Sequence, residues 1–298
     1  MIVFPNAKIN IGLRVTGRRP DGYHDLDTIF YPIPLCDSLE VVPMSIGQQV
    51  NDSTNPQTDI KLHLVGAELG GAVEDNLVVR AYRRLKADFP EMPPVEVWLY
   101  KHIPSGAGLG GGSADATFML RLLNTMFALG LTDDRLEALS ATLGADCPFF
   151  VRNTAVRATG TGNIFSPVAI DLKGYRIVVV KPPVFVSTKE AFSRIDEEFR
   201  SGIRQDSKTT CGQDEEDLIQ RVDLPACPPA RLTNDFERSV FPLHPELASI
   251  KQRLYEAGAT YASMSGSGSA LYGLFPLAAP YPLTAADFPD CFFWSAAL

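Results

Sequence analysis

The feature that most constrains this chain is a glycine-rich stretch, PSGAGLGGGSADA, at residues 104–116. Five of its thirteen residues are glycine, and it joins an alternating segment, VEVWLYKHI, to an apolar stripe of helical spacing that ends at Gly130. Ordering three successive glycines costs so much conformational entropy that tight packing alone is a poor reason for them. We therefore predict that backbone N–H groups and a helix start near Ser113 converge on an anion, and a polyphosphate fits that geometry.

Two common phosphate-binding patterns do not match this stretch. Gly106, Gly108 and Gly111 satisfy GxGxxG, but the next segment is a second helical pattern, where a dinucleotide-binding fold needs a parallel strand and an acid. No Gly-Lys-Ser/Thr closes the loop, which excludes a P-loop. Asp115 would repel a phosphate unless it points away or meets a metal, and we expect it to complement the helix dipole.

Composition narrows the class of protein. A chain of 298 residues with 45% hydrophobic residues predicts two domains. The net charge of −8, with no basic run longer than a pair, argues against nucleic acid and anionic membranes and favours a small-molecule partner. The five cysteines are scattered without CxxC spacing, so neither disulfides nor a zinc site is indicated.

The chain shows no sign of secretion or membrane insertion. The first residues carry no basic leader, and the apolar runs are too short and too broken by proline to span a bilayer. We expect a cytoplasmic protein, and the sequence is compatible with a monomer or a homodimer.

Strand and helix patterns mix without a regular βαβ repeat, which predicts an α+β protein with domains at 1–160 and 161–298. The expected strands are 7–15, 26–31, 38–42, 60–65, 95–103 and 175–182, with two or three more near the C-terminus. The expected helices are one capped near Asp75, one from Ser113, one from Thr132 to Gly144, one at 188–199 and others within 234–257. The polar segment 45–59 predicts a mobile loop, and 200–224 an acidic insert.

Several polar residues have unremarkable readings when they are taken alone. Lys8 and Asn10 share the polar face of a half-buried strand, about 6.6 Å apart, and a lysine there is usually solvated. Asp146 precedes Pro148 and is typical of a turn. His24 fits a turn, Phe192 a helix core, and Ser265 begins a hairpin turn.

Three separated stretches resemble, in order and spacing, the three motifs of the GHMP kinases: PNAKIN at 5–10, PSGAGLGGGSADA at 104–116 and SMSGSGSALYGLF at 263–275. DGYH at 21–24, EDNLVVRA at 74–81 and LGADCPFF at 143–150 resemble the branch that acts on a cytidine diphosphate derivative. The resemblance implies a ribosomal-protein-S5-like N-terminal domain and a ferredoxin-like C-terminal domain. It also implies transfer of the ATP γ-phosphoryl group, with Mg²⁺, to the 2-hydroxyl of 4-diphosphocytidyl-2-C-methyl-D-erythritol in non-mevalonate isoprenoid biosynthesis.

The resemblance also assigns expected roles. Lys8 and Asp146 match the catalytic pair, Asp146 accepting the hydroxyl proton and Lys8 holding Asp146 ionised and offsetting phosphoryl charge. Tyr23 and Phe192 would sandwich the cytosine, His24 would bond its edge, and Asn10 the erythritol end. Ser113 could cap the helix, contact a phosphate or contact the metal. The expected ATP-binding residues are Pro104, Gly106, Ala107, Gly108, Leu109, Gly110, Gly111, Gly112 and Ser113, with Asn76 and Leu77 near adenine. Ser265, Gly266, Ser267 and Gly268 form the third motif, which would help to hold the phosphates.

Two departures from the family pattern concern the phosphate loops. Ala114 stands where a second serine is common, and the third motif has serines where some relatives have threonine. Because Lys8 and Asp146 are retained, we expect activity. The alternatives are another small-alcohol kinase, for homoserine or a mevalonate derivative, a non-catalytic binding protein of the same fold and, least favoured, a dehydrogenase.

Overall fold

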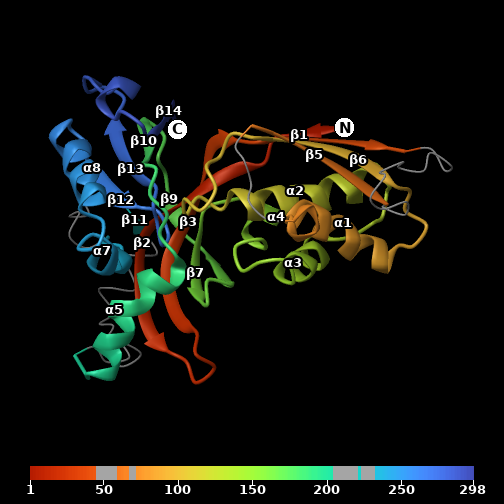
Figure 1. Cartoon of the computed structure of the whole chain (residues 1–298), viewed down its shortest axis with the longest axis horizontal. Helices are drawn as coiled ribbons and strands as arrows, with labels where there is room; N and C mark the ends of the chain where they lie inside the picture. Colours follow the sequence, from red (N-terminus) through yellow and green to blue (C-terminus); the bar gives the residue numbers. More distant parts are fainter. Residues whose placement is uncertain (45–58, 67–71, 204–220, 223–231) are drawn as a thin grey trace. The chain divides into compact units, whose positions relative to one another are not determined.

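The computed structural model describes residues 1–44, 59–66, 72–203, 221–222 and 232–298 (Figure 1). The chain forms two compact units that interleave along the sequence. The first comprises Met1–Ala7, Leu35–Ser105 and Gly110–Asn153, and the second comprises Lys8–Pro34, Gly106–Leu109 and Thr154–Leu298. The domain boundary predicted at residue 160 stays a prediction. The predicted loop at 45–59 and insert at 200–224 lie almost entirely outside the described residues.

The first unit contains a four-stranded sheet in the order β1-β4-β6-β5. Its strands are β1 (Ile2–Val3), β4 (Ser38–Pro43), β5 (Ile60–Gly66) and β6 (Val95–Lys101). Only β5 and β6 run parallel, and α1 (Leu77–Asp88) connects them. The other helices are α2 (Gly111–Met126), α3 (Asp133–Ala141) and α4 (Phe149–Arg152), and a 3₁₀ turn (Val73–Asp75) precedes α1. Figure 1 shows α1, α2 and α3 on one side of this sheet.

The core of the first unit follows from alternation along the strands. Val95, Val97 and Leu99 of β6 all point to the same buried face, as the VEVWLYK pattern predicts. They pack with the apolar stripes of α1 and α2, where Tyr82 and Leu120 are fully buried. This layer of helices on a sheet holds the start of α2 in place.

The second unit contains two four-stranded sheets, β2-β3-β7-β8 and β12-β13-β10-β14. The first sheet consists of β2 (Asn6–Arg18), β3 (His24–Cys36), β7 (Val156–Gly160) and β8 (Ile164–Pro167), with the ends of β2 and β3 belonging to the first unit. The second consists of β10 (Tyr175–Lys181), β12 (Tyr261–Met264), β13 (Leu271–Pro276) and β14 (Phe292–Ala297), all antiparallel. Short strands β9 (Ala169–Ile170) and β11 (Arg221–Val222) pair in parallel. The helices are α5 (Thr188–Arg200), α7 (Asp235–Val240), α8 (Pro245–Glu256) and a 3₁₀ turn (Ala285–Asp287).

Strand β10 lies inside its sheet and is buried on both faces. Ile177 to Val180 are all inaccessible to solvent, which explains the continuous apolar run VVV in place of an alternating pattern. Leu254 of α8 and Phe236 of α7 belong to the same buried cluster as Val178 and Val180. The observed elements confirm the predicted strands, the helix at 188–199 and the helices within 234–257.

Four helix ends lie a few residues from their expected positions. Asp75 ends the 3₁₀ turn, and Asn76 caps α1 by accepting a hydrogen bond from the Val78 amide at 2.9 Å. Helix α2 begins at Gly111, before Ser113, because Gly110 already has the left-handed conformation that separates loop from helix, and it ends at Met126. Thr132 caps α3 as predicted, but the helix stops at Ala141. These shifts of a few residues are typical of helix ends.

The mixture of antiparallel pairs, the parallel pairs β5–β6 and β9–β11, and separate helices confirms the predicted α+β class. Within the described ranges, no helix has the length and apolar character needed to cross a membrane. Cys36, Cys147 and Cys291, the cysteines that these ranges include, are free thiols.

Candidate active site

Lys8 and Asn10 lie on β2, as predicted, but their face of the strand is buried, which corrects the expectation of a solvated polar face. Each side chain is only 3% exposed. The Lys8 ammonium donates to Asn10 Oδ1 at 2.7 Å and lies 4.8 Å from the centre of the Phe30 ring. Asn10 Nδ2 donates to Thr28 Oγ1 at 3.1 Å. A buried ammonium must be neutralised or held by oriented dipoles, so this strand position is built to keep a cation in place.

The second-unit part of the glycine-rich loop, Gly106–Leu109, packs directly against the third motif. A Cβ on Gly108, whose φ is +73°, would lie 1.9 Å from the Ser265 carbonyl oxygen. The Ser265 hydroxyl donates to the Gly108 carbonyl at 2.9 Å, and the Ala270 amide donates to the Ala107 carbonyl at 3.2 Å. The loop thus reaches the β12–β13 turn so closely that only glycine fits at position 108.

The backbone amides of these two loops remain available for a ligand. Among the described residues, no acceptor pairs with the N–H groups of Gly106, Ala107 and Gly108, or with those of Gly266 and Ser267. Amides left without acceptors in a loop that approaches a second loop form a concave set of donors. The chemical group that such a set favours is an anion with several oxygen atoms.

In the first unit, the chain continues from Gly110 into α2, whose first amides have no acceptor within the helix. The first hydrogen bond of this helix runs from the Ala114 amide to the Gly110 carbonyl at 2.9 Å. Gly111 approaches closely, since a Cβ there would lie 2.9 Å from Ile103 Cγ2. The helix start therefore carries the positive end of the helix dipole, as the sequence predicts.

Ser113 and Asp146 lie in the first unit, and Cys147 links their surroundings. A Cβ on Gly144 would lie 3.1 Å from the Cys147 sulfur and 3.7 Å from the Ser113 hydroxyl. Thr117 of α2 donates to the Cys147 carbonyl at 2.8 Å. Burial raises the pKa of the Cys147 thiol, and the charge of Asp146 adds to this. The turn that carries Asp146, predicted from Pro148, is thereby attached to the first turns of α2.

A buried cluster of charges in the first unit is the main feature that the sequence analysis missed. Lys101, at the end of β6, donates to Asp115 Oδ2 at 2.7 Å and also to Asp37. Asp37 in turn accepts from the Ile103 amide at 2.8 Å. Asp115 therefore turns into the protein to meet Lys101, which corrects the expectation that it complements the helix dipole. The available signal was Lys101 itself, which occupies a core-facing position of the alternating strand.

The two carboxylates share one ammonium, so the cluster carries excess negative charge. Burial raises the pKa of Asp115 to about 7, the Asp37 charge adds to the rise, and Lys101 opposes it. Burial disfavours the charged form of Lys101, but the carboxylates outweigh it and raise its pKa. Asp115 Oδ1 is buried and, among the described residues, has no hydrogen-bond partner. The surroundings therefore favour the protonated form of Asp115 more than water does.

A cavity of about 210 Å³ opens beside this cluster in the first unit. Asn76 and Leu77, expected from the sequence to lie near adenine, both line it, as do Lys101 and Asp115. The remaining lining residues are Leu64, Ala72, Val73, Asp75, Ser105 and Gly112. Apolar walls with a few polar groups are typical of a site for a flat heterocycle.

The three residues expected at a cytosine lie in the second unit, on β3, the turn before it and α5. His24 stacks on Phe192, with ring centres 4.4 Å apart and an angle of 13° between the planes. Its Nε2 lies 3.0 Å from Asp196 Oδ1. Tyr23 is 66% exposed. His24, and not Tyr23, therefore covers one face of Phe192 in this structure.

The structure thus brings together two groups of predicted residues. Lys8, Asn10, Gly106–Leu109 and Ser265–Gly268 belong to the second unit, whereas Asn76, Leu77, Ser113 and Asp146 belong to the first. In the part of the chain that is described, no three histidine, cysteine, aspartate or glutamate side chains are grouped as a metal site.

Comparisons with known proteins identify the family. Residues 76–154 match the family model of the GHMP kinases N terminal domain, and 225–283 match that of the GHMP kinases C terminal. A protein of Bacteroides thetaiotaomicron named 4-diphosphocytidyl-2-C-methyl-D-erythritol kinase is 52% identical over 278 residues, which cover 92% of each chain. A protein of the same name from Parabacteroides distasonis is 48% identical over 300 residues and covers both chains fully.

Solved structures show the same relationship. The crystal structure of a 4-(cytidine 5'-diphospho)-2C-methyl-D-erythritol kinase is 32% identical, with a TM-score of 0.69, and covers 92% of this chain and 90% of that one. The mevalonate kinase of Methanococcus jannaschii shares the fold, with a TM-score of 0.64 at 14% identity, and covers 100% and 98% of the two chains.

Proposed function

The chain belongs to the GHMP kinase family, with its two-domain fold of mixed sheets and helices, and on that premise we propose that it phosphorylates the 2-hydroxyl of 4-diphosphocytidyl-2-C-methyl-D-erythritol with ATP. The main support for the proposal is sequence identity with two kinases named for this substrate. It is 52% over 92% of this chain for one and 48% over 100% for the other. The enzyme is an ATP-dependent kinase of isoprenoid biosynthesis. The non-mevalonate route and a cytoplasmic location belong to the proposal.

Phosphoryl transfer requires mainly alignment and neutralisation of charge. The amides of Gly106 to Gly108 have no acceptor within the described protein, which supports a role in binding the ATP phosphates. Those of Gly266 and Ser267 support the same role for the third motif. The first amides of α2, including that of Ser113, carry the positive end of a helix dipole, which supports a role in phosphate binding for this element of the first unit as well.

Lys8 and Asp146 supply the acid–base and electrostatic parts of the proposal. Asp146 accepts the proton of the substrate 2-hydroxyl as the oxygen attacks the γ-phosphorus, a role worth about 10²–10⁴-fold in rate. The Lys8 ammonium offsets the negative charge of the transferred group. Its hydrogen bond to Asn10 and its burial hold it in one orientation, which supports this role. Asn10 in turn contacts the erythritol end of the substrate.

Mg²⁺ would neutralise the phosphate oxygens of ATP. A magnesium ion bound through phosphates needs only one or two protein ligands and keeps several waters. The Ser113 hydroxyl, in the first turn of α2, is an oxygen donor of the kind that this ion accepts, and it fits without a cluster of carboxylates. We assign Ser113 to this role.

The apolar cavity of the first unit and the aromatic residues around Phe192 indicate where the two bases bind. Adenine occupies the cavity between Asn76 and Lys101, where Leu77 supplies an apolar wall. Cytosine stacks on Tyr23 and Phe192 and bonds to His24. Because His24 covers Phe192 in this structure, the base would take its place on that ring and leave the imidazole at the base edge.

The test is ADP release by the purified protein from ATP and Mg²⁺, with 4-diphosphocytidyl-2-C-methyl-D-erythritol, homoserine and mevalonate offered in parallel. We expect turnover with the cytidine substrate only, and a fall of about 10²–10⁴-fold for Asp146→Asn. Asp134→Asn, an exposed aspartate of α3, is the matched control. Turnover with homoserine or mevalonate would transfer the same chemistry to another alcohol. ATP binding without any turnover would favour the non-catalytic alternative.

A further inference from the structure

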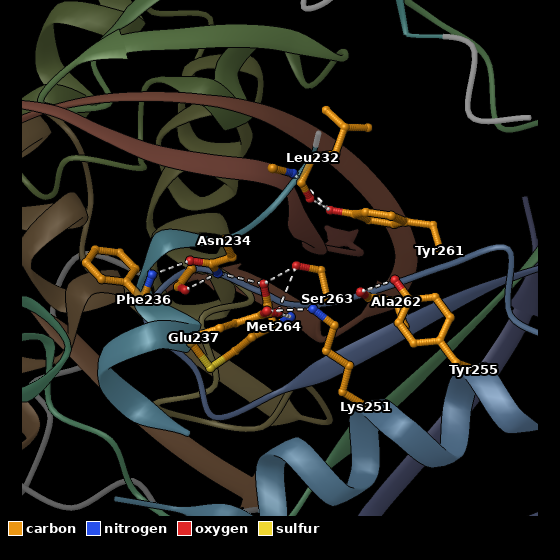
Figure 2. Close-up of polar contacts among 12 residues, drawn as sticks. Leu232, Asn234, Phe236, Glu237, Lys251, Tyr255, Tyr261, Ala262, Ser263 and Met264 are labelled. Atoms are coloured by element: carbon orange, nitrogen blue, oxygen red, sulfur yellow. Dashed lines mark hydrogen bonds and ion pairs between the residues drawn. The ribbon is translucent and has the colours of Figure 1, made fainter. Parts of the chain in front are cut away.

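Two side chains at the start of α7, those of Asn234 and Glu237, form hydrogen bonds with the third motif and the end of β12. The sequence analysis gave neither residue a role. Asn234 is 2% exposed and uses its whole amide group. Its Nδ2 donates to the Met264 carbonyl and to the Gly266 carbonyl, both at 2.8 Å, and its Oδ1 accepts from the Phe236 amide at 3.0 Å. Figure 2 shows Asn234 between α7 and the end of β12.

The two acceptors of Asn234 flank Ser265 on both sides. Ser265 is the residue whose hydroxyl donates to the Gly108 carbonyl at 2.9 Å and accepts from the Asn10 backbone amide at 3.3 Å. One side-chain amide thus holds the carbonyl of the residue before Ser265 and that of the residue after it. Ser265 in turn joins the third motif to the glycine loop and to the strand that carries Lys8.

Glu237 holds the other backbone group of Met264, its N–H. Its Oε1 accepts from the Met264 amide at 2.9 Å and from the Ser263 hydroxyl at 3.3 Å, while its Oε2 accepts from Lys251 at 2.5 Å (Figure 2). The N–H and C=O of Met264 are therefore both bound by side chains at the start of α7. Since buried peptide groups that are fully paired resist displacement, this end of β12 forms a rigid support for the turn.

We propose that Asn234 is a positioning residue for nucleotide binding: its two donated hydrogen bonds hold the third motif at the distance from the glycine loop at which both loops contact the ATP phosphates. The inference rests on the proposed function, because it requires that Ser265 to Gly268 contact the nucleotide. Asn234 itself touches neither substrate.

The competing explanation is that Asn234 serves only as the helix cap of α7. The two explanations predict different rankings of the Asn234 variants in stability and in nucleotide affinity. Asparagine, aspartate and serine cap helices about equally well, and alanine is worse by about 1 kcal/mol. The Asn234→Asp variant would keep the cap but would place a carboxylate against two carbonyl oxygens, whereas the Asn234→Ala variant would remove the donors without adding repulsion.

The experiment measures the dissociation constant of a non-hydrolysable ATP analogue with Mg²⁺ by calorimetry, together with the KM for each substrate and urea unfolding. We expect Asn234→Asp to weaken nucleotide binding by about tenfold or more, beyond the loss in Asn234→Ala, as the removal of two buried hydrogen bonds requires. The KM of the alcohol substrate at saturating ATP should stay within about twofold. Asn234→Ser keeps the cap but loses both donated hydrogen bonds, so it should be more stable than Asn234→Ala by about 1 kcal/mol and still bind nucleotide as weakly.

The control is Thr132→Ala, which removes the cap of α3 and should cost stability without a change in nucleotide affinity. Wild-type affinity in Asn234→Asp, or in Asn234→Ser if the aspartate variant does not fold, would overturn the inference and leave a helix cap. Because analogue binding requires no alcohol substrate, the inference is decided even if the wild type does not phosphorylate the cytidine compound. That result would contradict the proposed function alone.

Discussion

Lys101 shows at the scale of single residues how this protein places charge in its interior. It is buried with Asp37 and Asp115, so three ionisable groups share a site with little exposure to solvent. Such a cluster is weak support for stability when intact, but removal of its one cation leaves two carboxylates unpaired. The cluster also lines the cavity to which we assign adenine, so its charge bears on both folding and binding.

We predict that Lys101→Met destabilises the protein by about 3–5 kcal/mol, because it leaves two buried carboxylates without a cation. Urea unfolding at neutral pH measures this. Lys61→Met is the matched control, since Lys61 pairs with Glu96 on the surface and should cost about 1 kcal/mol or less. A loss in Lys101→Met no larger than in the control would contradict the charge-cluster account.

The raised pKa of Asp115 predicts a pH dependence of stability. An unfolded aspartate has a pKa of about 4, whereas that of Asp115 in the folded protein is about 7. Between these values the folded state holds a proton that the unfolded state has released, so this group's contribution to stability falls as pH rises through the window. The difference in unfolding free energy between Asp115→Asn and the wild type should therefore grow from pH 4 to pH 7. Two parallel pH profiles would show that Asp115 does not titrate there.

Tyr23 provides a residue-scale test of the substrate. It is 66% exposed, so its ring is accessible to a base, and stacking is worth about 1–3 kcal/mol. Tyr23→Ala should raise the KM of the cytidine substrate by about 5–150-fold and leave that of ATP unchanged. Tyr100→Ala, which removes an exposed tyrosine of β6, should change neither value. An equal rise of both KM values would argue against a specific cytosine contact.

At the scale of elements, hydrogen bonds join the glycine loop to the β12–β13 turn. Ser265 donates a hydrogen bond to the loop, and Gly108 allows the two backbones to lie close together. Asn234 and Glu237, at the start of α7, form hydrogen bonds with the residues on either side of Ser265. The loop carries amides without acceptors in the described protein, so its rigidity comes from these neighbours and not from its own hydrogen bonds. Ala114, which departs from the family pattern, is fully buried, so its side chain is not accessible to solvent.

Gly108→Ala should separate the loop from the turn. The new Cβ would lie 1.9 Å from the Ser265 carbonyl oxygen, so the backbone must move, and we expect nucleotide affinity to fall by about tenfold or more. Gly130→Ala has the same left-handed φ, +71°, but no atom within 4 Å, so it should cost only about 1–2 kcal/mol of backbone strain. Calorimetric titration of the ATP analogue into both variants measures the contrast, and equal affinities would contradict the close-approach argument.

At the scale of the whole molecule, nucleotide binding should stabilise the folded state, because the unfolded chain does not hold the loop amides in a binding arrangement. ATP with Mg²⁺ at about one hundred times its dissociation constant should stabilise the protein by about 2.7 kcal/mol. Removal of Mg²⁺ with EDTA should abolish turnover and reduce this gain, whereas Asp146→Asn should retain it and lose turnover. Thermal unfolding with and without nucleotide measures the effect. No shift for the wild type would contradict nucleotide binding by the folded chain.

The sequence by itself determined the local elements and the order of the three motifs, because hydrophobic periodicity, helix caps such as Thr132 and glycine turns act within a few residues. It also led to the predicted glycine loop and the family resemblance. Only the tertiary structure decided that Lys8 and Asn10 are buried, that Asp115 turns to Lys101, that His24 covers Phe192 and that Asn234 holds the third motif. The contacts that bury or hold these side chains include elements far away in the chain, and neither periodicity nor spacing along one segment records which distant segment will pack against it.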